Sequence, residues 1–249
     1  MVENSGPARR RGSDYLWLCL AASAVTFVGF WFTYFSPMLG GQYPEVSPTV
    51  HLHGWTFFFW YLLLPLQAGL VKSRRVALHR KLGYGSIGLA MAMTVTGLVV
   101  IGVQMELARQ PEGSPFWGAL GPGVFVTLVL FAGFYSLAIR FRRQRELHKR
   151  FVLLASAGGL GAAGFRIVAQ ILGPGFAAGV IGILLPNLII VAAMVLELRR
   201  DDRIHAVYSW GLPISVAAEA GVILMTPHLP GEVLISSLAW MGRLLGPLY

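Results

Sequence analysis

Long apolar runs alternate with short polar segments along the chain. A helix needs roughly 20 mainly apolar residues to cross a membrane. Seven runs reach or approach this length, and each predicts one spanning helix: Tyr15–Phe35, Thr49–Val71, Gly83–Met105, Gly123–Ile139, Phe151–Leu172, Phe176–Leu196 and Ala206–Thr226. Proline, glycine and charged residues lie between the runs, where they end helices and form turns. The pattern predicts an all-α, polytopic integral membrane bundle of seven transmembrane helices.

The same pattern divides the chain into three parts. We expect residues 1–14 to form a cytoplasmic tail, residues 15–227 the transmembrane domain, and residues 228–249 an outer helix and tail. In the last part, GEVLISSLAWMGRLLG places apolar residues on one helical face at Leu234, Leu238, Met241 and Leu245. This segment is too short to span a membrane comfortably, so the sequence predicts a short C-terminal interfacial helix.

Composition and charge support the membrane interpretation. The chain is 55% hydrophobic and 12% charged, whereas soluble domains carry about 25% charged residues. The net charge of +9 does not indicate nucleic-acid binding, because the basic residues cluster in short segments between apolar runs. All 20 Lys and Arg residues fall on one side of the predicted bundle except Arg109, Arg166 and Arg243. Basic loops stay in the cytoplasm, so we expect a cytoplasmic N-terminus and a C-terminus outside.

Four histidines lie at notable positions on the predicted helices. At 3.6 residues per turn, His53 shares a face with other polar residues and should point into the bundle. His79, His148 and His205 each begin a face of their helix at the basic side, and small residues on such faces let helices approach closely. A histidine beside Arg or Lys at a helix end is also a common interfacial residue, and that interpretation stays open.

The interpretation that we favour from these residues is a haem-binding redox protein for electron transfer. A haem b needs two imidazoles at one depth on facing helices, and cations for its propionates. His79 and His148 meet the first condition, and Arg80, Lys149 and Arg150 meet the second. Glycines follow both histidines and would leave space for the flat ring.

A metal-dependent membrane enzyme is one alternative. His79, His148 and His205 would then hold zinc or another transition metal, with a fourth position open for water. No carboxylate inside a predicted span lies near these histidines to orient them.

A small-solute or proton-coupled transporter is the other alternative, and it needs no cofactor. Charged residues inside a span usually face the interior, form pairs and mark function. Arg166 and Glu219 lie at a similar depth in their spans, and we expect them to form an ion pair. The sequence thus predicts a buried polar cluster of His53, Arg166, Asn187 and Glu219. The broken helices typical of transporters are indicated only at Pro186 and Pro213.

A few short motifs carry a resemblance to a known family. They are H-L-H-G at 51–54, Gln67, L-H-R-K-L-G at 78–83, L-H-K-R at 147–150 and R-I-H at 203–205. With them the chain resembles a group of uncharacterised bacterial multi-pass membrane proteins, described as a domain of unknown function. The resemblance implies a bacterial inner-membrane location and no particular reaction. The helix-end histidines resemble, more loosely, those of b-type cytochromes. The expected partners are the lipid bilayer and either a redox partner or a small-molecule substrate.

Overall fold

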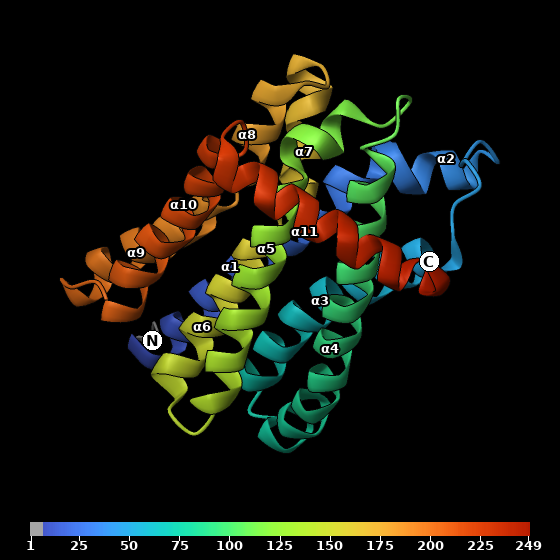
Figure 1. The fold of residues 1–249 in the computed structure, drawn as a ribbon. Coiled ribbons are helices and arrows are strands. Elements are labelled where there is room, and N and C mark those ends of the chain that lie inside the picture. Colours follow the sequence, from blue (N-terminus) through green and yellow to red (C-terminus); the bar gives the residue numbers. More distant parts are fainter. Residues whose placement is uncertain (1–6) are drawn as a thin grey trace.

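The structure, a computed structural model, describes residues 7–249, and its secondary structure in this range is helical throughout. Figure 1 shows a bundle of long helices that run between two ends. The long helices are α1 (Pro7–Phe30), α3 (Pro48–Lys72), α4 (Val76–Leu107), α5 (Pro115–Arg140), α10 (Ala206–Met225) and α11 (Leu229–Leu245). The shorter elements are η1 (Trp31–Phe35), α2 (Ser36–Leu39), α6 (Arg145–Gly158), α7 (Gly161–Leu172), α8 (Phe176–Leu184), α9 (Asn187–Asp201) and η2 (Gly246–Leu248).

The fold confirms the predicted all-α polytopic membrane bundle. Within residues 7–249, six stretches of helix are long and apolar enough to cross a membrane, and α6 with α7 makes a seventh if the pair counts as one span bent by 45°. Their outward faces carry large apolar side chains, such as Trp17, Met91 and Leu224, which are 66%, 64% and 72% exposed. Such faces suit contact with lipid chains rather than with water.

The two ends of the bundle differ in charge. At the end drawn at the bottom and lower left of Figure 1, α3 leads into α4, α5 leads into α6, and α9 leads into α10. The connecting segments are KSRR at 72–75, RFRRQR at 140–145 and ELRRDDR at 197–203. We name this the basic end.

Some helix boundaries differ from the predicted ones. The helix α4 begins at Val76 rather than Gly83, so His79 lies inside its first turns. The helix α5 begins at Pro115 and continues through Pro122, although the predicted span began at Gly123. A proline inside a membrane helix is tolerated where neighbouring groups satisfy the freed backbone carbonyl. Of the predicted tail at residues 1–14, residues 1–6 lie outside the described residues, and α1 begins at Pro7.

The predicted C-terminal helix is α11, and it lies across α4 and α5 at the end opposite the basic end (Figure 1). Gly242 of α11 and Gly102 of α4 meet backbone to backbone: a Cβ atom added to Gly102 would stand 3.0 Å from the Cα atom of Gly242. Two glycines at a crossing allow this close approach.

Packed aromatic side chains fill the middle of the bundle. We name Trp60, Tyr61, Phe131 and Tyr135 the aromatic plug. The ring of Trp60 lies 4.9 Å from the rings of both Phe131 and Tyr135, centroid to centroid. Tyr61 donates a hydrogen bond to the carbonyl of Ser156 at 2.6 Å, and Trp60 donates to the Ser156 hydroxyl at 3.2 Å. The plug therefore ties α3 and α5 to the last turn of α6.

Candidate functional site

A cavity of about 290 Å³ lies between the aromatic plug and the end opposite the basic end. Most of its wall is apolar and aromatic, with contributions from α3, α4, α5 and α7. Binding sites for small molecules typically combine such walls with a few polar groups. The polar groups that reach this main cavity come from Thr33, Tyr34, Tyr43, His53, Gln104, Thr127, Arg166 and Tyr249.

Two irregular segments of backbone border the main cavity. The π-helical turn η1 carries Thr33 and Tyr34 into its wall, and π-helical turns occur often at functional sites. The break between α6 and α7 contributes Gly159, where a Cβ atom would stand only 3.1 Å from the Tyr61 hydroxyl. Irregular backbone inside a membrane bundle is tolerated where it is buried in protein or lines a cavity.

Arg166 of α7 is the charged side chain among the described residues that line the cavity. Its Nε donates to the Thr33 hydroxyl at 2.9 Å, and its Nη1 donates to the carbonyl of Ala162 at 2.8 Å. The guanidinium lies 4.2 Å from the centre of the Phe30 ring. Within residues 7–249, the ion pairs found join other groups, and Arg166 has no carboxylate partner.

His53 also lines the cavity, and its tautomer follows from its neighbour. The Thr96 hydroxyl donates to the carbonyl of Ala92 at 2.7 Å. Its oxygen therefore accepts from Nδ1 of His53, which lies 3.2 Å away. The hydrogen on Nδ1 leaves the lone pair on Nε2, so Nε2 is the acceptor atom of this cavity-lining side chain. The prediction that His53 points into the bundle is confirmed.

Tyr43 brings the segment between α2 and α3 to the same wall. Its ring lies 5.0 Å from that of Tyr34, and Tyr34 shares a 3.0 Å hydrogen bond with Nδ1 of His51. Burial raises the pKa of Tyr43, its neighbour Tyr34 raises it further, and Arg166 acts in the opposite direction. The hydroxyl of Tyr43 is thus a neutral donor close to the Arg166 charge.

The predicted ion pair between Arg166 and Glu219 is wrong. Glu219 is 1% exposed and accepts a 2.6 Å hydrogen bond from the side-chain amide of Asn187. Asn187 also donates to the carbonyl of Leu184 at 3.1 Å, next to the break between α8 and α9. Arg166 turns the other way, toward α1 and η1. The predicted buried polar cluster is therefore two sites: His53 and Arg166 at the cavity, and Asn187 with Glu219 between α9 and α10.

Two of the three histidines predicted at the basic end meet. The rings of His79 and His148 lie 6.4 Å apart, centroid to centroid, at an interplanar angle of 83°. His148 donates from Nδ1 to the carbonyl of Ala138 at 2.9 Å, which leaves its lone pair on Nε2. Nδ1 of His79 and Oε1 of Gln67 are buried and have no hydrogen-bond partner among the described residues.

His205 lies apart from that pair and caps α10. Its Nδ1 accepts a 3.2 Å hydrogen bond from the backbone N–H of Val207, and its own backbone N–H donates to Glu197 at 2.9 Å. Across residues 7–249 the structure contains no group of three His, Cys, Asp or Glu side chains placed to hold a metal ion. His79, His148 and His205 are therefore not gathered into one site.

Arg150, predicted to bind a haem propionate, is part of a buried ion-pair network instead. It is 4% exposed and contacts Glu197 at 2.5 Å and Glu146 at 2.7 Å. Lys149 pairs with Glu146 at 2.6 Å. Both cations are thus already paired with carboxylates of the chain. Of the three predicted cations, Arg80 is the exposed one.

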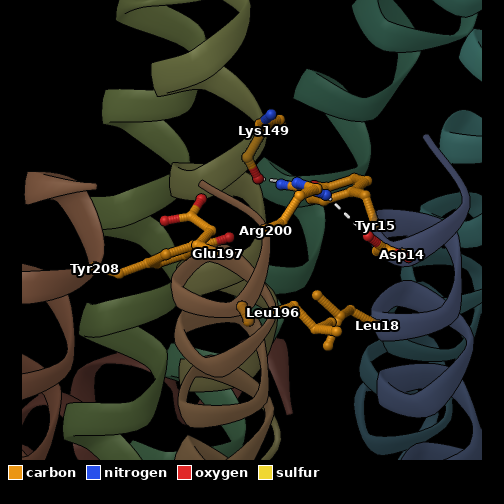
Figure 2. A pocket seen from close by; sticks show the side chains of 9 residues that line it. Asp14, Tyr15, Leu18, Lys149, Leu196, Glu197, Arg200 and Tyr208 are labelled. Carbon is orange, nitrogen blue, oxygen red and sulfur yellow. Dashed lines mark hydrogen bonds and ion pairs between the residues drawn. The ribbon is translucent and has the colours of Figure 1, made fainter. Parts of the chain in front are cut away.

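Figure 2 shows the neighbouring contacts that join α1, α6 and α9. Arg200 of α9 pairs with Asp14 of α1 at 2.8 Å, and the Tyr15 hydroxyl donates to the backbone carbonyl of Lys149 at 2.8 Å. The pocket between these side chains measures about 30 Å³, which leaves room for only a water molecule or two. This cluster stabilises the basic end and is too small to bind an organic molecule.

Several residues of the main cavity were not predicted as site residues. Gln104 shares a helical face with His79 at 3.6 residues per turn, and this spacing is a usable sequence signal. Thr33 and Tyr43 gave none, because a π-helical turn and a connecting segment bring them to Arg166. The chain matches no protein-family model, no curated protein and no solved structure.

Proposed function

We propose that this membrane protein is a transporter that binds a small organic solute in its main cavity. The observation that carries the proposal is a cavity bordered by a broken helix, with the Arg166 cation and the neutral His53 in its wall. Discontinuous membrane helices with a binding site at the break are a recurrent transporter design. The break between α6 and α7 supplies the feature that the sequence indicated only at Pro186 and Pro213.

The aromatic plug supports the proposal because it separates the cavity from the basic end. Phe131 belongs both to the plug and to the cavity wall. Tyr61 and Trp60 bind the plug to Ser156, just before the break. A change in the bend between α6 and α7 would move Ser156 away from Trp60 and Tyr61. The aromatic plug would then loosen and open a path from the cavity to the basic end. We propose this hinge as the step that exposes the site alternately to each side.

Single-cysteine labelling tests the path. Cys19 is the chain's one cysteine, so Cys19→Ala gives the background. Val50→Cys places a thiol in the cavity wall, and Ser86→Cys places one behind the plug, where Ser86 contacts the Tyr135 hydroxyl at 2.7 Å. A membrane-impermeant maleimide should label V50C when it is added on the side opposite the basic end. It should label S86C when it is added on the side of the basic end.

The control is Val129→Cys, because Val129 is 49% exposed on an outward, apolar face and should stay unreactive inside lipid. Labelling of V50C without any labelling of S86C in folded protein would mean that no path connects the cavity to the basic end. Transport would then be the wrong function.

A second candidate, a haem-binding redox protein, is favoured by the contact of His79 with His148. Bound haem would supply one-electron transfer. His148 has the tautomer of an Nε2 ligand, with Nδ1 oriented by a backbone carbonyl as metal-ligating histidines usually are. The unpartnered Nδ1 of His79 calls for an explanation. We place this candidate second because Tyr135 and Trp60 fill the bundle interior beyond Ser86.

The absorption spectrum of protein purified from haem-replete cells tests this second candidate. Two imidazole ligands should give a sharp α band on reduction by dithionite, and either His79→Ala or His148→Ala should abolish it. His51→Ala, which changes a histidine outside the pair, serves as the control.

A further inference from the structure

We propose that the main cavity takes a small aromatic monocarboxylate that also carries a hydroxyl group. This inference rests on the proposed function and names the class of its solute. Three features of the cavity carry it: an unpaired cation, a wall of aromatic rings and a fixed hydrogen-bond acceptor.

The cation requires an anionic partner. Arg166 has no carboxylate partner within residues 7–249, and none of the described residues that line the cavity is Asp or Glu. A charge within a membrane bundle is costly, and such side chains usually pair with an opposite charge. The bonds of Arg166 to Thr33 and Ala162 use Nε and Nη1, so Nη2 stays available. A carboxylate suits the planar guanidinium better than a spherical ion does.

The aromatic wall of the cavity favours a ligand with an aromatic ring. Phe57, Phe116 and Phe131 line the cavity, and Phe30 lies against the guanidinium. Aromatic rings stack favourably on one another and exclude water. An inorganic anion would leave this surface uncovered. The volume of about 290 Å³ lies at the lower limit for small-molecule sites, which favours a molecule with a single ring.

His53 favours a hydroxyl as the second polar group of the ligand. Thr96 holds the hydrogen on Nδ1, so Nε2 accepts a hydrogen bond and does not donate one. A ligand hydroxyl donates to it, whereas a second carboxylate would leave two acceptors facing each other. A hydroxyl at the far end of the ring from the carboxylate would let one molecule contact both Arg166 and His53.

Calorimetric titration of the purified full chain in detergent tests the class. The probe is 4-hydroxybenzoate. Benzoate lacks the hydroxyl, 4-hydroxybenzyl alcohol lacks the charge, and chloride lacks the organic body. We expect 4-hydroxybenzoate to bind at least about tenfold more tightly than the neutral alcohol, with benzoate between them and chloride a weak competitor. A tenfold ratio corresponds to about 1.4 kcal/mol.

Substitutions at Arg166 and His53 test which residue contacts which group of the ligand. Arg166→Gln should remove the preference for the anion, and Arg166→Lys, which keeps the charge, should retain part of it. His53→Phe should make 4-hydroxybenzoate bind no better than benzoate. The comparison of probes on the unchanged protein stays informative even if a variant fails to fold.

Equal binding of the neutral alcohol, or tight binding of chloride alone, would overturn the inference, and so would no binding of 4-hydroxybenzoate. None of these results affects the labelling of S86C from the basic side, which tests transport separately. Tight anion binding with S86C unlabelled would instead keep the ligand class and reject transport.

Discussion

Two arginines of this bundle show how partners decide the role of a charge between membrane helices. Arg150 lies between Glu146 and Glu197, with its guanidinium 5.7 Å from the centre of the Tyr208 ring. Among residues 7–249, the partners of Arg166 are neutral: Thr33, the Ala162 carbonyl and the Phe30 ring. The first is neutralised inside the protein and holds helices together. The second keeps an unmatched charge at a cavity, which is the property of a binding group.

Glu197→Gln should destabilise the protein by about 1.5–3 kcal/mol, because it removes the buried partner of Arg150 and leaves only the more exposed Glu146. Chemical denaturation in detergent measures the change. Glu232→Gln is the matched control, since it removes an exposed carboxylate. Replacing Arg150 and Glu197 together by Met and Leu should cost less than E197Q alone. Equal stability of the E197Q and E232Q variants would contradict the buried pair.

His205 should make stability depend on pH. Burial lowers its pKa, Arg150 and Lys149 lower it further, and Glu197 and Glu146 oppose them. In the unfolded chain, His205 binds a proton near the ordinary histidine pKa of about 6.5. In the folded chain, it binds the proton only at a lower pH. Stability is therefore fully present above that pH and is lost as pH falls toward the folded pKa.

The melting temperature of the wild type should fall further between about pH 7.5 and pH 5.5 than that of His205→Asn, around the ordinary pKa of about 6.5. Asparagine also caps helices and does not titrate. An equal fall in both proteins would show that His205 contributes nothing to this dependence.

At the scale of elements, glycine pairs set how closely the helices approach. Gly102 meets Gly242 where α4 crosses α11, and Gly164 meets Gly182 where α7 crosses α8. In each pair a Cβ atom would run into the backbone of the other helix. Without a hydrophobic driving force between helices, such close packing is a main source of association in membranes.

Gly242→Ala should destabilise the docking of α11 by about 1–3 kcal/mol, as overpacking does elsewhere. Gly246→Ala is the control on the same segment, because a Cβ atom there would meet nothing within 4 Å. Thermal denaturation in detergent compares the two variants. Similar melting temperatures would show that α11 adjusts to the added methyl group.

The hydrophobic pattern predicted the elements better than their irregularities. It located the spans and the inward face of His53, because length and a 3.6-residue period are properties of one helix. It missed the break before Gly161, since glycine and alanine continue the apolar run. It also missed the partner of Arg166, because η1 changes the helical phase and so moves Thr33. Contacts between helices depend on such changes, which a single-helix projection does not contain.

At the scale of the whole molecule, the charge asymmetry predicts orientation. The loops of the basic end should lie in the cytoplasm, because basic loops resist translocation. Reporter fusions after Gln110 and Gln144 should report opposite compartments, with Gln144 inside. A fusion after Gln42, between α2 and α3, adds a check and should agree with Gln110. The same compartment for Gln110 and Gln144 would refute the arrangement.

The unpaired charge of Arg166 has a consequence for energetics across an energised membrane. With a monoanion bound, the site is neutral and insensitive to voltage, whereas the empty site carries one positive charge. Moving one charge through the full potential changes the free energy by about 2.3 kcal/mol per 100 mV. An inside-negative potential would draw the empty site toward the cytoplasm and leave the loaded step unaffected. Under the proposed transport function, a potassium gradient with valinomycin in proteoliposomes should therefore speed net export of 4-hydroxybenzoate and slow its net import, so that the membrane potential alone would set the direction of net transport.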